Sequence, residues 1–290
     1  QDGDQGRIIH RANPFNGGYI ELYCDLFRIT GNQKYLNFAE EESGAWLRSS
    51  FFRRHGLFQR IELADNRWLY PALSWRIRPP LARLFKDNTN LMYSLVELHH
   101  QSGDDSLREG ILRWVEGFEE HFWNNGKTYL YVDKQMQGYE VSLKAAFSAL
   151  DLLCDIHWRM DKNSHVLEMA KGIADQWMDA AWPNGLFPLE YDGPIDHLDA
   201  NADMCVALAK LRQITGDDRY KQAYERCMES LCQTHATEHG YVLSIDRSGK
   251  TVDPAIVVKY QGLMLKLALL AQNGPTIYGN DRLFNLMRDR

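Results

Sequence analysis

The sequence has little of several features that define whole classes of protein. Its longest apolar stretch, Gly262 to Ala271, is too short to cross a bilayer and contains Lys266. A net charge of −6 argues against a nucleic-acid-binding surface. The motifs GxGxxG, GxxxxGK[ST], HExxH and GxSxG are missing, so nucleotide-cofactor, zinc-protease and serine-hydrolase chemistry have no support. We therefore expect a soluble protein that binds neither membrane nor nucleic acid, and we assign it no cofactor.

Cysteine is scarce as well, with five residues and no CxxC spacing. Each lies in a segment whose pattern predicts a helix: Cys24, Cys154, Cys205, Cys227 and Cys232. Buried free thiols are the interpretation that we favour, ahead of a nucleophile or a disulfide. An odd number of helical thiols favours a reducing compartment such as the cytoplasm, although the sequence leaves the localisation unknown.

What the sequence does contain is an internal repeat. Four similar turns each lie between two long segments of helical periodicity, namely Thr30-Gly31-Asn32, Ser102-Gly103-Asp104, Asp161-Lys162-Asn163 and Thr215-Gly216-Asp217. A glycine follows each turn at a similar distance and leads into a short aromatic or aliphatic run: Gly56, Gly126, Gly185 and Gly240. Together these features predict a repeated structural unit.

Hydrophobic periodicity identifies the unit as a helical hairpin. Leu143, Phe147, Leu150 and Cys154 step by four, three and four residues, which places them on one helical face. Each hairpin would span roughly 50 residues and end in a glycine-led loop or short strand. We predict one domain over residues 1–290, with hairpins at about 13–58, 87–132, 139–190, 198–245 and 253–272 and an insertion at 61–86.

A single amphipathic hairpin cannot bury its apolar face, so successive hairpins must stack. Open superhelices usually keep a tight repeat length, whereas the distance between turns drifts here. The drift favours a closed ring, so we predict an all-α fold, an α/α toroid that is either incomplete or a six-hairpin barrel.

In its repeated helical hairpins the chain resembles the six-hairpin (α/α)-toroid carbohydrate-active enzymes. The resemblance rests on the turn Thr30-Gly31…Tyr35…Trp46-Leu47 with the loop Gly56-Leu57-Phe58, and on Thr215-Gly216-Asp217…Tyr220. The segment Asp87-Asn88-Thr89-Asn90-Leu91…Leu95…Ser102-Gly103-Asp104 is similar to a stretch of the unsaturated uronyl hydrolases. The resemblance implies six hairpins, of which five are visible in the sequence.

In a toroid the first helix of each hairpin lines the centre and starts at one end, where a substrate cleft opens. The predicted helix starts are polar throughout. They carry Asn16, Asp87, Asn90, Tyr139, Glu140, Asp199, Asn201, Asp203, Lys259 and Tyr260.

The densest polar cluster precedes and opens the segment from residue 198. It contains Asp192, Asp196, His197, Asp199 and Asp203. Helix capping and a solvated acidic loop would explain these acids. Alternatively, burial and mutual repulsion can separate the pKa values of neighbouring carboxyls into one acid and one base. Metal binding is a further alternative, but no strict metal-loop spacing is present, and we assign no metal site.

The insertion is basic and aromatic in a chain that is otherwise acidic. Trp68, Trp75, Arg76 and Arg78 are its candidate substrate-binding residues. Aromatic faces stack on sugar rings, and arginine recognises carboxylates through two parallel hydrogen bonds. A surface loop packed over the fold would account for the same residues.

The function that we predict first is hydrolysis of a glycosidic bond in an oligosaccharide, including one with uronic acid. Its catalytic candidates are Asp87, Glu140, Asp199, Asp203 and His197. A sugar epimerase or a polysaccharide lyase is the alternative on the same scaffold, because both take a proton from carbon, which suits His197, Tyr139 or Tyr260. A non-catalytic helical-repeat binding protein is the third interpretation. The sequence leaves the oligomeric state open.

Overall fold

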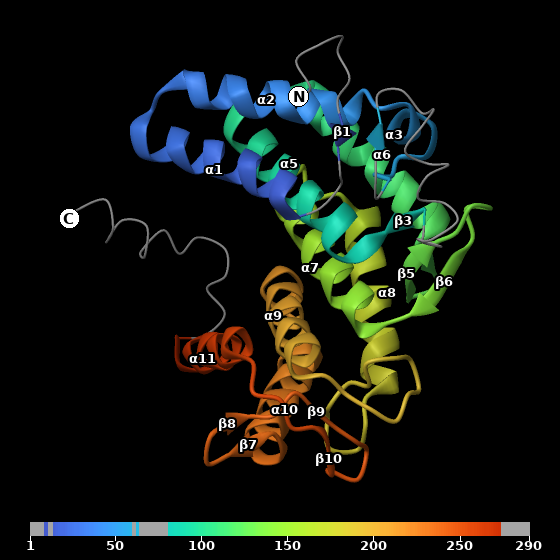
Figure 1. The fold of residues 1–290 in the computed structure, drawn as a ribbon, viewed down its shortest axis with the longest axis vertical. Coiled ribbons are helices and arrows are strands. Elements are labelled where there is room, and N and C mark those ends of the chain that lie inside the picture. The colour runs from blue at the N-terminus through green and yellow to red at the C-terminus, as the bar shows by residue number, and fades with distance from the viewer. Residues whose placement is uncertain (1–8, 11–13, 60–61, 64–80, 274–290) are drawn as a thin grey trace. The chain divides into compact units, whose positions relative to one another are not determined.

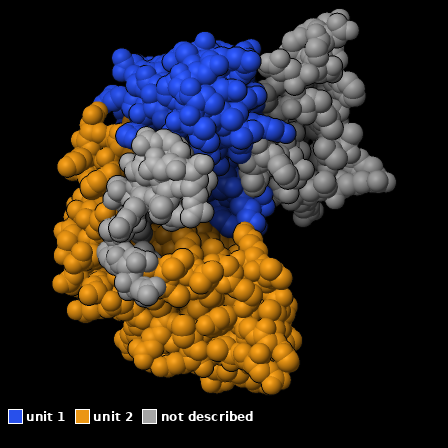
Figure 2. All heavy atoms as spheres, turned by 90° about the vertical axis from the view of Figure 1, so that its left-hand side faces the viewer, with its two compact units in different colours: residues 1–124, 129–139 blue, residues 125–128, 140–290 orange. Residues whose placement is uncertain are grey.

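The computed structural model describes residues 9–10, 14–59, 62–63 and 81–273 (Figure 1). The described chain divides into two compact units, coloured separately in Figure 2. Unit 1 contains the N-terminal residues up to Asn124 together with Tyr129–Tyr139. Unit 2 contains Asn125–Thr128 and the chain from Glu140 onward. The single domain that the sequence predicts stays a prediction, and each unit is described by itself.

Unit 1 consists of two helical hairpins with short strands. Its helices are α1 (Pro14–Thr30), α2 (Gln33–Leu47), α3 (Ser50–His55), the turn η1 (Leu84–Asn88), α5 (Thr89–Ser102) and α6 (Asp105–His121). Helix α1 packs on α2 and α5, and α5 packs on α6. The strands of this part of the chain are β1 (Ile9–His10), β2 (Glu62–Leu63), β3 (Ala82–Arg83), β4 (Trp123–Asn124), β5 (Lys127–Val132) and β6 (Gly138–Val141).

Unit 2 contains two further hairpins and a final helix. Its helices are α7 (Leu143–Arg159), α8 (Ser164–Ala180), α9 (Leu198–Thr215), α10 (Asp218–Thr234) and α11 (Val258–Asn273). Short strands follow α10: β7 (Ala236–Thr237), β8 (Gly240–Tyr241), β9 (Ser244–Ile245) and β10 (Thr251–Asp253). Helix α9 is central because α7, α10 and α11 all pack on it, and most of its side chains are buried.

The repeated turns have a physical cause in helix capping. Gly31, Gly103 and Gly216 each end the first helix of a hairpin with a positive φ, a conformation that glycine adopts without strain. The next element begins with a side chain that accepts a hydrogen bond from a backbone N–H two residues further on. These caps are Asn32, Asp104, Asn163 and Asp217. The turn between the two helices of a hairpin therefore needs nearly the same short sequence each time, which explains the repeat.

The loop glycines are required by close packing on the next hairpin. A Cβ atom on Gly56 would lie 2.2 Å from the carbonyl oxygen of Arg113 in α6. A Cβ atom on Gly185 would lie 2.6 Å from the Arg226 side chain in α10. Both glycines also have positive φ angles, so any other residue would be strained twice over.

The core is aromatic and apolar, with fully buried tryptophans such as Trp46, Trp114 and Trp177. Four of the five cysteines are buried free thiols, as predicted, whereas Cys232 is exposed on α10. Cys232 is not among the buried side chains of α10, which include Tyr224, Cys227 and Leu231. Within the described part of the chain, no helix combines the length and the hydropathy that crossing a bilayer requires.

Candidate active site at the start of helix α9

Three helices of unit 2 place charged or polar side chains around one carboxylate. Lys144 is the second residue of α7, Asp199 the second of α9 and Tyr260 the third of α11. The Lys144 charge and the Tyr260 hydroxyl both act on Asp199, which is 6% exposed. The starts of three successive first helices therefore meet at Asp199.

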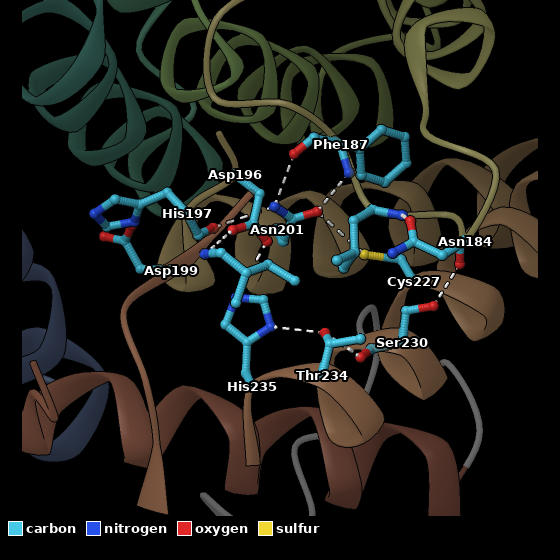
Figure 3. Close-up of polar contacts among 12 residues, drawn as sticks. Asn184, Phe187, Asp196, His197, Asp199, Asn201, Cys227, Ser230, Thr234 and His235 are labelled. Carbon is cyan, nitrogen blue, oxygen red and sulfur yellow. Dashed lines mark hydrogen bonds and ion pairs between the residues drawn. The ribbon is translucent and has the colours of Figure 1, made fainter. Parts of the chain in front are cut away.

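His197 is the closest partner of Asp199. It precedes α9 with an extended backbone, which directs its ring back along the helix start. Its Nδ1 atom lies 2.5 Å from Oδ1 of Asp199 (Figure 3). The ring meets Tyr260 edge to face, with 5.9 Å between centroids. No hydrogen-bond partner for the other ring nitrogen, Nε2, occurs among the described residues, so this atom is available to a ligand.

The two acids of α9 have opposite pKa shifts. Burial alone would raise the pKa of Asp199, but the hydrogen bond and charge of His197, the charge of Lys144 and the hydroxyl of Tyr260 together lower it. Burial raises the pKa of Asp203 to about 6, and the negative charge of Asp199 acts in the same direction. At neutral pH, Asp199 is therefore ionised, while about a tenth of Asp203 is protonated. Such a separation is typical of groups that exchange protons.

The surrounding charges favour an anionic or polar ligand. Lys266 and Lys259 on α11 lower the pKa of Asp203 and partly oppose its burial. Burial and then the charge of Asp199 raise the pKa of Tyr260, so its phenol stays protonated at neutral pH and can donate a hydrogen bond. Lys259 also lies over the Tyr260 ring, with its Nζ 5.7 Å from the centroid.

Asn201 does not join this group of side chains. It is fully buried, and its Oδ1 accepts the backbone N–H of Phe187 at 2.8 Å. Its Nδ2 donates to the carbonyl oxygens of Phe187 and His197 (Figure 3). The amide holds the loop before α9, and the role of Asn201 in substrate binding stays a prediction.

Glu140 lies just before α7 and is exposed. Burial of its carboxyl and the nearby charge of Glu190 raise its pKa. Its backbone has a φ of 63°, which is unusual for a residue with a side chain and costs free energy. Hydrogen bonds from Leu143 to Leu189 and from Tyr191 to Val141 join the two loops that carry these acids. Glu140 and Glu190 thus form a separate acidic pair, beyond the contacts of Asp199.

The predicted site residues of unit 1 have different surroundings. Asp87 is 1% exposed and forms a bidentate pair with Arg83, whose Nη2 is 2.8 Å and Nε 3.1 Å away. This buried pair ties Asp87 to Arg83, and the role of Asp87 as a catalytic acid stays a prediction. Asn90 is half-buried in the first turn of α5. Tyr139 is exposed and packs on Tyr131 with 5.4 Å between centroids.

Several predicted residues lie outside the part of the chain whose side chains are described. Asn16 falls in the first turn of α1, but its side chain is not among those that the structure describes. The predicted basic and aromatic residues of the insertion also fall outside, namely Trp68, Trp75, Arg76 and Arg78. Their roles stay predictions.

A cavity of about 350 Å³ lies beside the loop that leads into α9. Trp182, Pro183, Asn184 and Arg247 line it, and the Arg247 guanidinium lies 5.9 Å from the Trp182 ring centroid. The backbone N–H of Arg247 donates to the carbonyl oxygen of Pro194, three residues before His197. Among all residues that the structure describes, no group of three or more His, Cys, Asp or Glu side chains is placed to hold a metal ion.

The fold defines the class of the chain, an α/α toroid of helical hairpins, and solved structures share it. A cellobiose 2-epimerase from Bacillus thermoamylovorans has 12% identity, with 88% of this chain and 70% of that chain covered at a TM-score of 0.66. A sugar epimerase from a ruminal bacterium has 12% identity, coverage of 97% and 74%, and a TM-score of 0.70. An unsaturated glucuronyl hydrolase specific for heparin has 13% identity, coverage of 91% and 76%, and a TM-score of 0.62.

This likeness confirms the predicted all-α toroid and the predicted resemblance to carbohydrate-active toroid proteins at the level of the fold. No protein-family model matches the chain, and a search of curated proteins gave no significant match.

Sequence reasoning missed Lys144, Lys266 and Arg247. The sequence did contain a signal for Lys144. It is the second residue of its helix, after the cap Ser142, just as Asp199 is the second residue of its helix, after the cap His197. Lys266 and Arg247 had none, since their places depend on how α11 and the 243–250 loop pack on α9.

Proposed function

We propose that this chain is a sugar epimerase or isomerase that moves protons at the carbon beside a sugar carbonyl. The observation that carries this proposal is the His197–Asp199 contact, in which Nδ1 lies 2.5 Å from a carboxylate that Tyr260 also contacts. A carboxylate on Nδ1 fixes the ring and leaves Nε2 as a base, which is the arrangement that proton abstraction requires.

The proposed roles follow from the two pKa shifts. Neutral His197 takes the proton from the carbon beside the carbonyl, while protonated Asp203 gives its proton to the carbonyl oxygen, so an enediol forms. Asp199 orients His197 and stabilises the imidazolium that results. Return of a proton to the other face of the same carbon gives the epimer, and return to the neighbouring carbon gives the isomer. Solved neighbours of the fold include epimerases and a D-mannose isomerase, which supports this chemistry.

Glycoside hydrolysis is the second candidate, because Asp199 and Asp203 are an acid–base pair with separated pKa values. We rank it lower because both acids are one turn apart on α9. Their Cβ atoms are therefore only about 5 to 6 Å apart and point the same way, whereas the two carboxyls of a glycosidase flank the bond from opposite sides. The neighbouring unsaturated glucuronyl hydrolases keep this candidate open.

Recognition of an acidic sugar is proposed for the cavity beside the loop into α9. Arg247 supplies a guanidinium that binds carboxylates through two hydrogen bonds, and Trp182 supplies an apolar wall against which a sugar ring can pack. Among the described residues, Arg247 and Trp182 are the ones that support a substrate with uronic acid. A protein that only binds ligand would not need the opposed pKa shifts of Asp199 and Asp203.

The test is incubation of the full chain with reducing mono- and disaccharides in D₂O, followed by proton NMR and ultraviolet absorbance. An epimerase or isomerase gives a new sugar that carries deuterium at the carbon beside the carbonyl. A hydrolase gives new reducing ends without deuterium on carbon, and a lyase gives an absorbing unsaturated product.

His197→Gln and Asp199→Asn should each lower kcat by about a hundredfold or more. The matched control is Asp192→Asn, an exposed acid of the same loop at a φ of 60° that asparagine tolerates. Deuterium-free products, or full activity in His197→Gln, would reject the proposal.

A further inference from the structure

Next to the proposed site lies a buried aspartate–histidine pair that the proposed reaction does not use. Oδ2 of Asp196 is 3.1 Å from Nε2 of His235, and both side chains are fully buried (Figure 3). Asp196 is the residue before His197, and His235 directly follows α10. The pair therefore joins the segment that carries the site to the end of a neighbouring helix.

Both residues also hold the same stretch of backbone, 242–245. Oδ1 of Asp196 accepts the N–H of Ile245 at 2.8 Å, and the Asp196 N–H donates to the Ile245 carbonyl at 3.1 Å. The carbonyl of His235 accepts the N–H of Val242 at 2.9 Å. Leu198 donates to Leu243, so the chain on both sides of His197 is fixed to this stretch.

The hydrogen bonds around Thr234 place a proton on Nδ1 of His235. The Thr234 hydroxyl donates its one hydrogen to the Ser230 carbonyl at 2.7 Å. Its oxygen, 3.1 Å from Nδ1 of His235, can then only accept, so Nδ1 is the donor. Nε2, on the other side of the ring, faces Oδ2 of Asp196 at 3.1 Å.

Replacement of a buried ion pair by apolar residues is often neutral or stabilising, so such a pair contributes more to geometry than to net stability. We propose that Asp196 and His235 are positioning residues that hold the His197–Asp199 contact in place. Without the pair, the 195–198 segment loses its side-chain anchor, and the ring of His197 is no longer fixed relative to Asp199 and Tyr260. The catalytic readout below rests on the proposed function, whereas the spectroscopic readout does not.

The experiment compares His235→Leu with His235→Gln in the full chain. Leucine removes both ring nitrogens and leaves the Asp196 carboxylate buried without the polar group that faces it, whereas glutamine keeps one N–H donor toward Asp196. The matched control is His157→Leu, a histidine that is 6% exposed near the end of α7 and bonded through Nδ1 to the Asn163 carbonyl at 2.8 Å. It removes a buried histidine from the opposite end of α7 and lowers stability without contact with the site.

The first readout is the ¹⁵N and ¹H NMR signal of the His197 ring, assigned with His197→Gln. We expect it to move in His235→Leu, to move little in His235→Gln, and to stay unchanged in His157→Leu. The second readout is a kcat that falls about tenfold or more in His235→Leu, with a smaller change in KM and partial recovery in His235→Gln.

An unchanged His197 signal in folded His235→Leu would overturn the positioning role. If the signal moves while the wild-type chain turns over no sugar, the positioning role stands and the proposed function fails. If His235→Leu does not fold, His235→Asn decides, because asparagine can keep a donor toward Thr234 but removes the group that faces Asp196. A shifted His197 ring signal in that variant supports the positioning role, and an unaltered signal rejects it.

Discussion

Asn88 and Asn201 make the same set of hydrogen bonds in two different hairpins. Oδ1 of Asn88 accepts the N–H of Phe58 at 2.8 Å, and Oδ1 of Asn201 accepts that of Phe187 at the same distance. Each Nδ2 donates back to the carbonyl of the same phenylalanine. Each Oδ1 also accepts from the second helix of its hairpin, from Trp114 and Cys227 respectively. The glycine-led loop is thus clamped in both hairpins by one buried amide.

Asn201→Ala should therefore destabilise the fold strongly. It leaves the N–H and the carbonyl of Phe187 buried without partners, at a cost of about 2 to 4 kcal/mol. Asn88→Ala should cost a similar amount for the same reason. Urea unfolding measures both, with the exposed Asn37→Ala as the control, expected to stay within about 0.5 kcal/mol. Equal midpoints for Asn201→Ala and Asn37→Ala would contradict the clamp.

Asp203 should make stability depend on pH in a defined direction. Because its folded-state pKa of about 6 lies above the ordinary 3.8, the fold favours the protonated form. The contribution of Asp203 to stability is complete below about pH 4 and is lost as the pH rises through 6. Asp203→Asn should then be more stable than the wild type at pH 7.5, by on the order of 2 to 3 kcal/mol, and equally stable near pH 3.5. Thermal unfolding at both pH values tests this.

The control for Asp203→Asn is Glu41→Gln, which removes an exposed charge on α2. It should change stability little at either pH. A gain for Asp203→Asn of the same size at both pH values would show that titration of this carboxyl is not the cause.

Lys210 forms a buried ionic group with two acids of α7. Its Nζ lies 2.7 Å from Asp151 and 3.0 Å from Asp155, and these charges raise its pKa despite the opposing effect of burial. Lys210→Met should cost about 2 to 4 kcal/mol, because both carboxylates lose their shared cation. It should also raise the pKa of Asp203 further, since the Asp151 charge already acts on that carboxyl. Urea unfolding and a carboxyl NMR titration measure the two effects, and an unmoved Asp203 titration would refute the second.

The hairpins were predictable because caps and glycines are local. Asn32, Gly31 and Gly56 fix turns through their own backbone, so their spacing reveals the repeat. The start of α9 was predictable as a polar site for the same reason. The different roles of Asp199 and Asn201 were not predictable from the sequence. Asn201 contacts Phe187 and Asp199 contacts His197 only once the loops and α11 have packed. Asp87 shows the same limit, since its partner Arg83 lies in the insertion, where the helical period gives no information.

Arg247 should control binding of an acidic sugar. In the proposed cavity its guanidinium pairs with a carboxylate, a charge-assisted contact. Arg247→Gln should weaken binding of glucuronate by about tenfold or more. Titration followed by Trp182 fluorescence measures this, with glucose as the ligand that lacks the charge. Equal affinity of the wild type for glucuronate and glucose would exclude a carboxylate subsite at Arg247.

Glu140 combines a strained backbone with a raised pKa, and two substitutions separate these properties. Glu140→Gly relieves the positive φ and should stabilise the chain by up to about 1 kcal/mol, whereas Glu140→Gln keeps the strain and removes only the charge. If the carboxyl takes part in proton transfer, both variants lose activity alike while only the glycine variant gains stability. Turnover of the sugar and thermal unfolding of both variants provide the measurements. Activity kept in both would remove Glu140 from the catalytic candidates, and a glycine variant less stable than the glutamine variant would show that contacts of this side chain outweigh the strain.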